Sequence, residues 1–220
     1  MIQITLCKKV FEKYISRYIC AVMWRLNGGK MEKFCKVVRI ITLAPVLAAF
    51  SIAMIGLFCA DVFPTVWHFG YMMLYLGVLP LLAYPLQSVT PHFKDKGRDG
   101  QRTLAMLFAV AGYVFCLVTN IFASASRGMW IICLEYLLSG ILILVFNKGL
   151  RIKLSAHGCG SAGPIFLLLY FGLYAPAALM AVVTVFAYVA SVKAKHHTVA
   201  QLIGGSAVSI MLLIGITSIL

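Results

Sequence analysis

Long apolar stretches separated by short polar segments run through this chain from residue 39 to residue 220. An α-helix needs about 20 predominantly apolar residues to cross a bilayer. The chain is 62% hydrophobic and 11% charged, whereas soluble domains are roughly 25% charged. The sequence therefore predicts an all-α integral membrane protein without a sizeable aqueous domain.

The apolar stretches predict a polytopic transmembrane bundle of about six to seven membrane-embedded helices. The expected spans are 39–60, 65–88, 103–124, 129–147 and 198–220, with kinks in the second at Pro80 and Pro85.

The stretch 158–193 has two interpretations, one long tilted helix or a hairpin of two short helices. The hairpin is favoured because Gly172 followed by Pro176 is a typical helix stop and restart. All three polar segments then emerge at one face of the membrane. A single helix would place the last of them on the opposite face.

Residues 1–30 differ in composition from the rest. Lys9, Lys13 and Arg17 repeat on one helical stripe and apolar side chains on another, which is typical of a basic amphipathic helix on a membrane surface. The alternative is that Met31 is the true start. Residues 31–220 are predicted to form a single transmembrane domain.

The chain carries 19 Lys and Arg against 6 Asp and Glu, a net charge of +13. Polytopic proteins concentrate such an excess in cytoplasmic loops. Membrane lipids and a phosphorylated lipid are therefore the expected partners, and nucleic acid is not. The seven cysteines lack zinc-site spacing and read as buried thiols, so neither a metal nor a cofactor is predicted.

Cations and histidines share three polar segments, 92–102, 147–163 and 191–197. Phosphoryl transfer needs fixed positive donors around the phosphate oxygens and a nucleophile or acid in line. The segments therefore indicate phosphate chemistry at the membrane surface. The alternative is that basic loops only set the topology, and that the small residues 155–163 only let helices pack closely.

The segments contain KGRDGQR at 96–102, KLSAH at 153–157 and SVKAKHHTVAQ at 191–201. Their order and spacing resemble the type 2 phosphatidic acid phosphatase (PAP2) superfamily over about residues 80–210. The resemblance implies a metal-independent lipid phosphatase or diphosphatase that forms a phosphohistidine on His197, with His157 as general acid. It implies phosphate-binding roles for the following residues: Lys96, Arg102, Lys153 and Ser155.

The chain departs from the family pattern at several motif positions. Thr103 stands where the family has Pro, the second motif lacks the Pro and Gly, and Ser191 and Gln201 replace an Arg and an Asp. If 193–201 is helical, Lys193 and Gln201 share a face with His197. Lys193 then replaces the missing Arg, and Gln201 orients the imidazole.

The phosphorylated lipid expected as substrate is phosphatidate, phosphatidylglycerol phosphate or a prenyl diphosphate. Two alternative functions are not catalytic. One is a membrane transport or binding subunit, and the other is a degenerate PAP2-fold protein that binds a phospholipid without hydrolysing it. The resemblance, to a small bacterial-type member, implies a bacterial cell membrane, and the charge bias favours a site on its cytoplasmic face. Glu135, inside a predicted span, is expected to serve a function or to pair with Tyr or Ser hydroxyls of a neighbouring helix.

Overall fold

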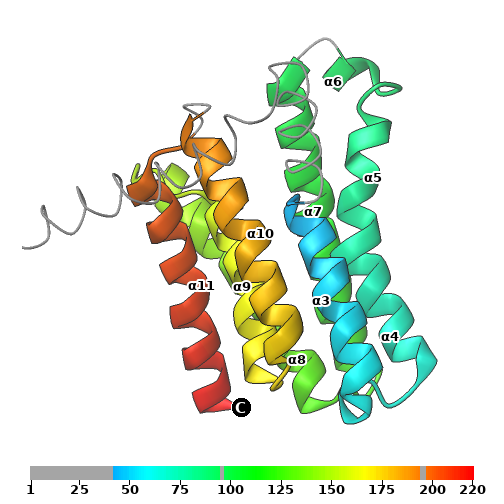
Figure 1. Ribbon diagram of the computed structural model, residues 1–220. Helices are drawn as coiled ribbons and strands as arrows, with labels where there is room; N and C mark the ends of the chain where they lie inside the picture. The colour runs from blue at the N-terminus through cyan, green and yellow to red at the C-terminus, as the bar shows by residue number, and fades with distance from the viewer. Residues whose placement is uncertain (1–41, 95–96, 194–196) are drawn as a thin grey trace, which may run out of the picture.

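The described part of the chain comprises residues 42–94, 97–193 and 197–220 of a computed structural model, without the side chains of residues 98, 99, 102 and 193. The predicted amphipathic segment 1–30 therefore lies outside it. Within the described part every element is helical (Figure 1). The elements are α3 (Ala44–Phe58), the 3₁₀ turn η1 (Ala60–Val62), α4 (Val66–Met72), the π-helix η2 (Met73–Val78), α5 (Leu79–Leu86), α6 (Pro91–Lys94), α7 (Gly97–Phe122), α8 (Arg127–Leu144), the π-helix η3 (Val145–Gly149), α9 (Ala156–Tyr170), α10 (Tyr174–Lys193) and α11 (Val199–Ile219).

Five helical segments in the described part are long and apolar enough to cross a membrane. This confirms a membrane protein with transmembrane helices. The five are Val66–Leu86, Thr103–Phe122, Arg127–Gly149, Tyr174–Val192 and Val199–Ile219. α3 and α9 have 15 residues each and are shorter than a full span.

The stretch 158–193 forms a hairpin, as predicted. α9 ends at Tyr170, α10 begins at Tyr174, and Gly172 in the turn has φ +75°. This left-handed conformation costs glycine little, because glycine has no Cβ. The hairpin returns the chain to the end from which α9 started.

The second span does not simply kink at its prolines. A π-helix, η2, joins α4 to α5, and the N–H of Leu79 donates to the carbonyl of Leu74 five residues earlier. In this pattern Pro80 would be the donor to Tyr75, but proline has no N–H. Gly112 of α7 packs there instead, so closely that a Cβ on it would lie 2.2 Å from the Tyr75 carbonyl oxygen.

The polar connections α5–α7, α8–α9 and α10–α11 all lie at one end of the bundle, the top in Figure 1. The α7–α8 connection, the α9–α10 turn and the C-terminus lie at the other end. The predicted grouping of the three polar segments is therefore confirmed for the residues that the structure describes. We call this end the polar end.

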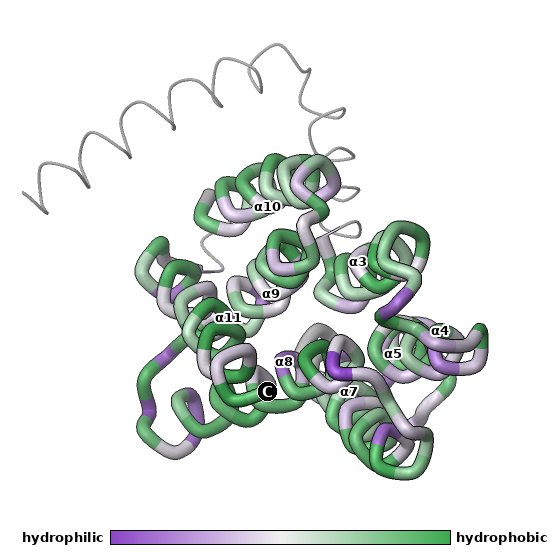
Figure 2. Tube along the Cα trace, turned by 90° about the horizontal axis from the view of Figure 1, so that it is seen from below, coloured by the Kyte–Doolittle hydropathy of each residue, from purple (hydrophilic) through white to green (hydrophobic). Residues whose placement is uncertain are grey.

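α9 is the central helix of the bundle. It packs against α3, α8, α10 and α11, and these surround it in the view along the bundle (Figure 2). A Cβ on Gly158 of α9 would lie 2.6 Å from the Leu202 carbonyl oxygen, and one on Gly205 of α11 would lie 2.2 Å from the Ser155 carbonyl oxygen. Two helices can approach this closely only where glycines face the neighbouring backbone.

Candidate active site at the polar end

His157 and His197 lie near each other at the polar end, although they belong to different elements. His157 is the second residue of α9, and His197 directly precedes Thr198, the residue that caps the N-terminus of α11. Both side chains are half-buried. Burial and then the electrostatic effect of the nearby His197 lower the pKa of His157 from its ordinary value of 6.5 to about 4. The His157 ring is therefore neutral at pH 7 in the free protein.

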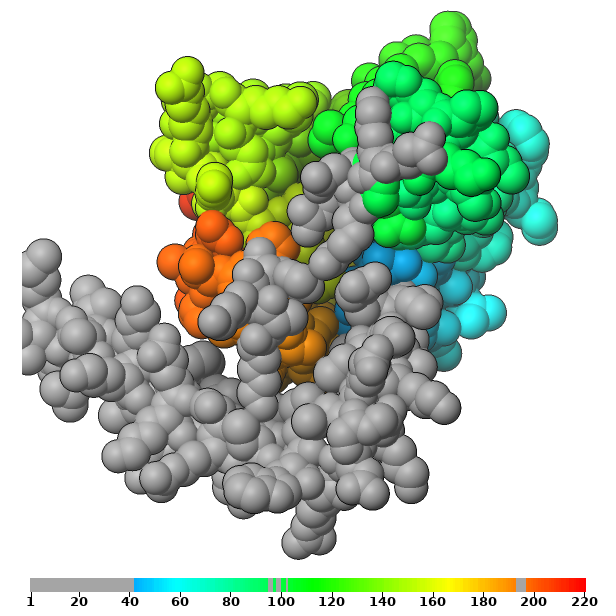
Figure 3. All heavy atoms as spheres, turned by 90° about the horizontal axis from the view of Figure 1, so that it is seen from above, coloured from blue at the N-terminus to red at the C-terminus, as the bar shows by residue number. Residues whose placement is uncertain are grey.

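The two histidine segments are also joined through their backbones. The N–H of Ser155 donates to the carbonyl of Gln201 over 3.0 Å. This bond ties the residue before α9 to the first turn of α11, so the N-termini of both helices lie side by side. In the view onto the polar end (Figure 3), the α8–α9 connection in yellow-green lies beside the orange start of α11.

Each of these helix N-termini is capped by a side chain. The Ser155 hydroxyl accepts the N–H of Gly158 over 3.1 Å. The Thr198 hydroxyl accepts the N–H of Gln201, whose side-chain oxygen in turn accepts the N–H of Thr198. The positive ends of two helix dipoles thus point toward the histidine pair, an arrangement suited to an anion.

The loop before α9 is shaped by Asn147 in η3. Its side chain bonds both backbone groups of Leu154, with Nδ2 donating to the carbonyl over 3.0 Å and Oδ1 accepting the N–H over 2.8 Å. The sequence analysis did not single out Asn147. Its position just before a basic loop is typical of a residue that bonds turn backbone, and this signal was available.

Tyr188 of α10 is a second residue that the sequence analysis missed. Its hydroxyl bonds the Gly158 carbonyl over 2.9 Å, the Ser206 hydroxyl over 2.8 Å and the Ser161 hydroxyl over 3.0 Å. Its ring centroid lies 6.4 Å from that of His157. Tyr188 therefore packs beside the candidate general acid and joins α9, α10 and α11. A tyrosine within an apolar span needs a partner for its hydroxyl, so its place in the sequence was a usable signal.

One prediction about residues 193–201 is corrected. The segment is not one helix, because α10 ends at Lys193 and α11 begins at Val199 after a Thr198 cap. Lys193, His197 and Gln201 therefore do not share a helix face. The side-chain oxygen of Gln201, predicted to orient the imidazole, accepts the Thr198 N–H, because the first N–H groups of a helix have no partner inside it.

Of the remaining predicted phosphate-binding residues, Lys153 is the one whose side chain the structure describes. Lys153 is exposed in the loop before α9. Lys96 lies outside the described residues, as do the side chains of Arg102 and Lys193. α7, which carries Arg102, packs against α5 and α8, and α8 separates it from α11 (Figure 2).

Small residues dominate the first two turns of α9, which fall within the polar segment 147–163. Residues 156–163 are helical, and most are buried against neighbouring helices. The alternative interpretation of this stretch, close helix packing, therefore agrees with the structure. His157 stands at the open end of this packed region.

Glu135 of α8 is only 1% exposed. Its Oε1 accepts hydrogen bonds from the Ser209 hydroxyl of α11 over 2.5 Å and from the Ser139 hydroxyl over 3.3 Å, and Oε2 has no hydrogen-bond partner. A Cβ on Gly163 would lie 2.9 Å from the Ser209 hydroxyl. The expected pairing with a serine of a neighbouring helix is therefore present, and Glu135 fastens α8 to α11 below the histidine pair.

No group of three His, Cys, Asp or Glu side chains among the described residues is placed to hold a metal ion. Comparisons of the chain with protein-family models, curated proteins and solved structures found no match.

Proposed function

We propose that this protein is a membrane-embedded lipid phosphatase or diphosphatase whose reaction passes through a phosphohistidine on His197. The observation that carries the proposal is the proximity of His157 and His197 between two helix N-termini. Two imidazoles beside positive helix ends supply what phosphoryl transfer requires, namely a nucleophile, an acid and electrostatic stabilisation of the phosphate oxygens.

In the proposed reaction, a ring nitrogen of His197 attacks the phosphorus, and the bond from phosphorus to the lipid oxygen breaks. His157 donates a proton to that oxygen, so the lipid leaves as an alcohol or, from a diphosphate, as a monophosphate. Water then attacks the phosphohistidine and releases inorganic phosphate, while His157 recovers its proton.

The neutral state of His157 in the free protein constrains this mechanism. A general acid must carry a proton before the leaving group departs. A phosphate bearing two negative charges favours the protonated imidazole, because an opposite charge nearby raises the pKa of histidine. Substrate binding therefore creates the acid form of His157, and the empty site does not hold it.

The substrate is a phosphorylated lipid because the site lies at the membrane end of a bundle whose outer surface is apolar. Many side chains along the spans are exposed and hydrophobic, among them Val114, Val118 and Ile203. Such surfaces face lipid tails in a bilayer. A lipid headgroup reaches the polar end without leaving the membrane.

The test is phosphate release by the purified full-length protein in detergent with EDTA, using phosphatidic acid, phosphatidylglycerol phosphate and prenyl diphosphates. We expect turnover of at least one of them and its complete loss in His197→Ala. His157→Ala should slow turnover by roughly 10²- to 10⁴-fold. His92→Ala is the matched control, since His92 is an exposed histidine of α6 at the same end.

Full activity of His197→Ala would show that another residue is the nucleophile. Binding of a labelled phospholipid without turnover of any substrate would contradict the enzyme and favour the degenerate, phospholipid-binding alternative. If the protein neither binds a phospholipid nor turns over any substrate, the proposal is contradicted and the alternative of a membrane transport or binding subunit is favoured.

A further inference from the structure

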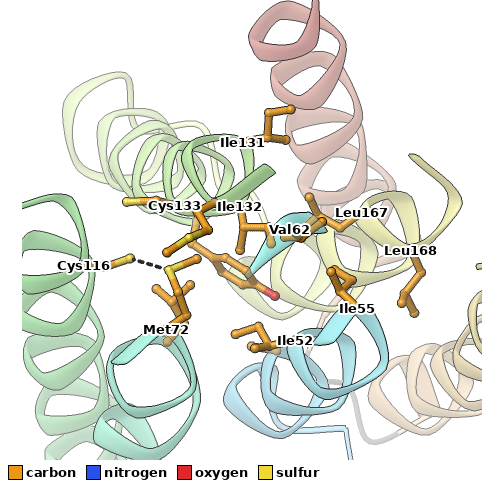
Figure 4. Packing of buried hydrophobic residues seen from close by; sticks show 14 of the residues in the cluster. Ile52, Ile55, Val62, Met72, Cys116, Ile131, Ile132, Cys133, Leu167 and Leu168 are labelled. Atoms are coloured by element: carbon orange, nitrogen blue, oxygen red, sulfur yellow. Dashed lines mark hydrogen bonds between the residues drawn. The ribbon is translucent and has the colours of Figure 1, made fainter. Parts of the chain in front are cut away.

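Three sulfur atoms from three helices converge in the half of the bundle away from the polar end. The Cys116 sulfur of α7 lies 3.3 Å from the Met72 sulfur of α4. The Cys133 thiol of α8 interacts with that of Cys116. Figure 4 shows the three side chains pointing toward one another, with the contact between Cys116 and Met72 dashed. All three residues are 0% exposed.

We infer that Cys116, Cys133 and Met72 form a binding site for a monovalent soft metal ion, Cu(I). Thiolate and thioether sulfurs are the ligands that select Cu(I). Three such donors come from separate helices, and the Cys116 and Met72 sulfurs lie 3.3 Å apart. The inference does not depend on the proposed phosphatase activity.

The charge balance in an apolar interior favours this ion over a divalent one. A buried net charge is costly unless it is paired. Cu(I) with one thiolate, one thiol and one thioether is a neutral group, and binding displaces one thiol proton to water. Zn²⁺ normally requires four ligands, and the described residues offer no third His, Cys, Asp or Glu beside the two cysteines.

The sulfur cluster lies close to the end opposite the histidine pair. Cys116 is six residues before the end of α7 at Phe122, and Cys133 is six residues after the start of α8 at Arg127. At a rise of 1.5 Å per residue, each cysteine lies about 9 Å along its helix from the helix end.

Polar groups lie between the sulfur atoms and this end. Asn120 is one helical turn nearer the end than Cys116, and its Oδ1 accepts the Tyr71 hydroxyl over 2.7 Å.

The experiment measures Cu(I) retention by the detergent-purified full-length chain under anaerobic, reducing conditions against a competing Cu(I) chelator. Cys7, Cys20 and Cys35 are first replaced by serine so that only the described cysteines can bind. We expect one retained Cu(I) per chain and three sulfur neighbours by X-ray absorption. Cys116→Ala and Cys133→Ala should each lose the ion, while Cys59→Ala, which alters a thiol that donates to the Phe171 carbonyl, should keep it.

Met72→Leu keeps the inference testable if an alanine variant fails to fold, because Leu and Met have similar volumes. It should reduce the sulfur neighbours from three to two. Circular dichroism and gel filtration identify the folded variants. Absence of retained Cu(I) in the folded parent, or full retention by folded Cys116→Ala or Cys133→Ala, would overturn the inference.

Discussion

At the scale of single residues, His157 combines partial burial with a neighbouring imidazole. Both effects disfavour its charged form, so its pKa falls to about 4. Tyr188 packs beside the ring, and the Ser155 cap fixes the start of α9 on which the ring stands. The side chain is thus held in place before any ligand arrives, which reduces the ordering required on binding.

The lowered pKa of His157 predicts a difference between two pH profiles. kcat/KM reports the free protein, so above pH 4 it should fall by about tenfold per pH unit as His157 loses its proton. kcat reports the complex, where bound phosphate raises the pKa, so its alkaline decline should begin at higher pH. Steady-state kinetics from pH 4 to 8 on the best lipid substrate measures both.

His157→Ala is the control for these profiles and should lose the alkaline decline in kcat along with most of the rate. Coincident kcat and kcat/KM profiles in the parent protein would contradict the assignment of His157 as an acid protonated on substrate binding.

At the scale of elements, the crossing of α9 and α11 positions the histidine pair. Gly158 and Gly205 let the two backbones touch, and the Ser155–Gln201 bond fixes their register. The Glu135–Ser209 pair ties α11 to α8 further along. A shift of α11 along α9 would separate His197 from His157.

Gly205→Ala is therefore expected to destabilise the protein and separate the two histidines. The new Cβ would lie 2.2 Å from the Ser155 carbonyl oxygen, which is backbone and cannot rotate away. Overpacking of this kind typically costs about 1–3 kcal/mol. Thermal unfolding in detergent and phosphate release measure the two effects.

Gly215→Ala in the same helix is the matched control, because nothing lies within 4 Å of its added Cβ. It should leave the stability unchanged or slightly raised. Equal behaviour of the two variants would show that the α9–α11 contact does not depend on glycine.

At the scale of the whole molecule, the three polar connections share one end because the chain crosses an even number of times between them. In the sequence, 18 of the 19 Lys and Arg lie in residues 1–39 or in the three polar segments, and Arg127 is the exception. Arg127 begins α8 at the opposite end. The positive-inside tendency then predicts that the polar end faces the cytoplasm.

Cysteine labelling in intact cells tests this orientation on a background without the seven native cysteines. Lys153→Cys places a thiol at an exposed position of the polar end, and Tyr174→Cys places one at an exposed position of the other end. A membrane-impermeant maleimide should modify Tyr174→Cys and spare Lys153→Cys until the cells are opened. The reverse pattern would place the candidate site outside.

The lengths of the apolar stretches and the positions of glycine and proline between them predicted most of the architecture. The hydrophobic stretches predicted the helices, because a bilayer leaves backbone groups no partner outside a helix. Gly172 and Pro176 predicted the hairpin, since a local turn depends on local residues. The same patterns located the His157 and His197 segments but could not show how closely they approach.

Only the tertiary structure decided which of the candidate residues meet. The contact of α9 with α11 depends on glycines facing the backbone of a distant segment, and the side-chain oxygen of Gln201 accepts the N–H of Thr198 at the start of α11. α8 lies between α7 and α11, so the order of the three motifs along the chain did not predict their distances in space. Side-chain partners across helices arise from packing between elements, and packing is not encoded at any single position.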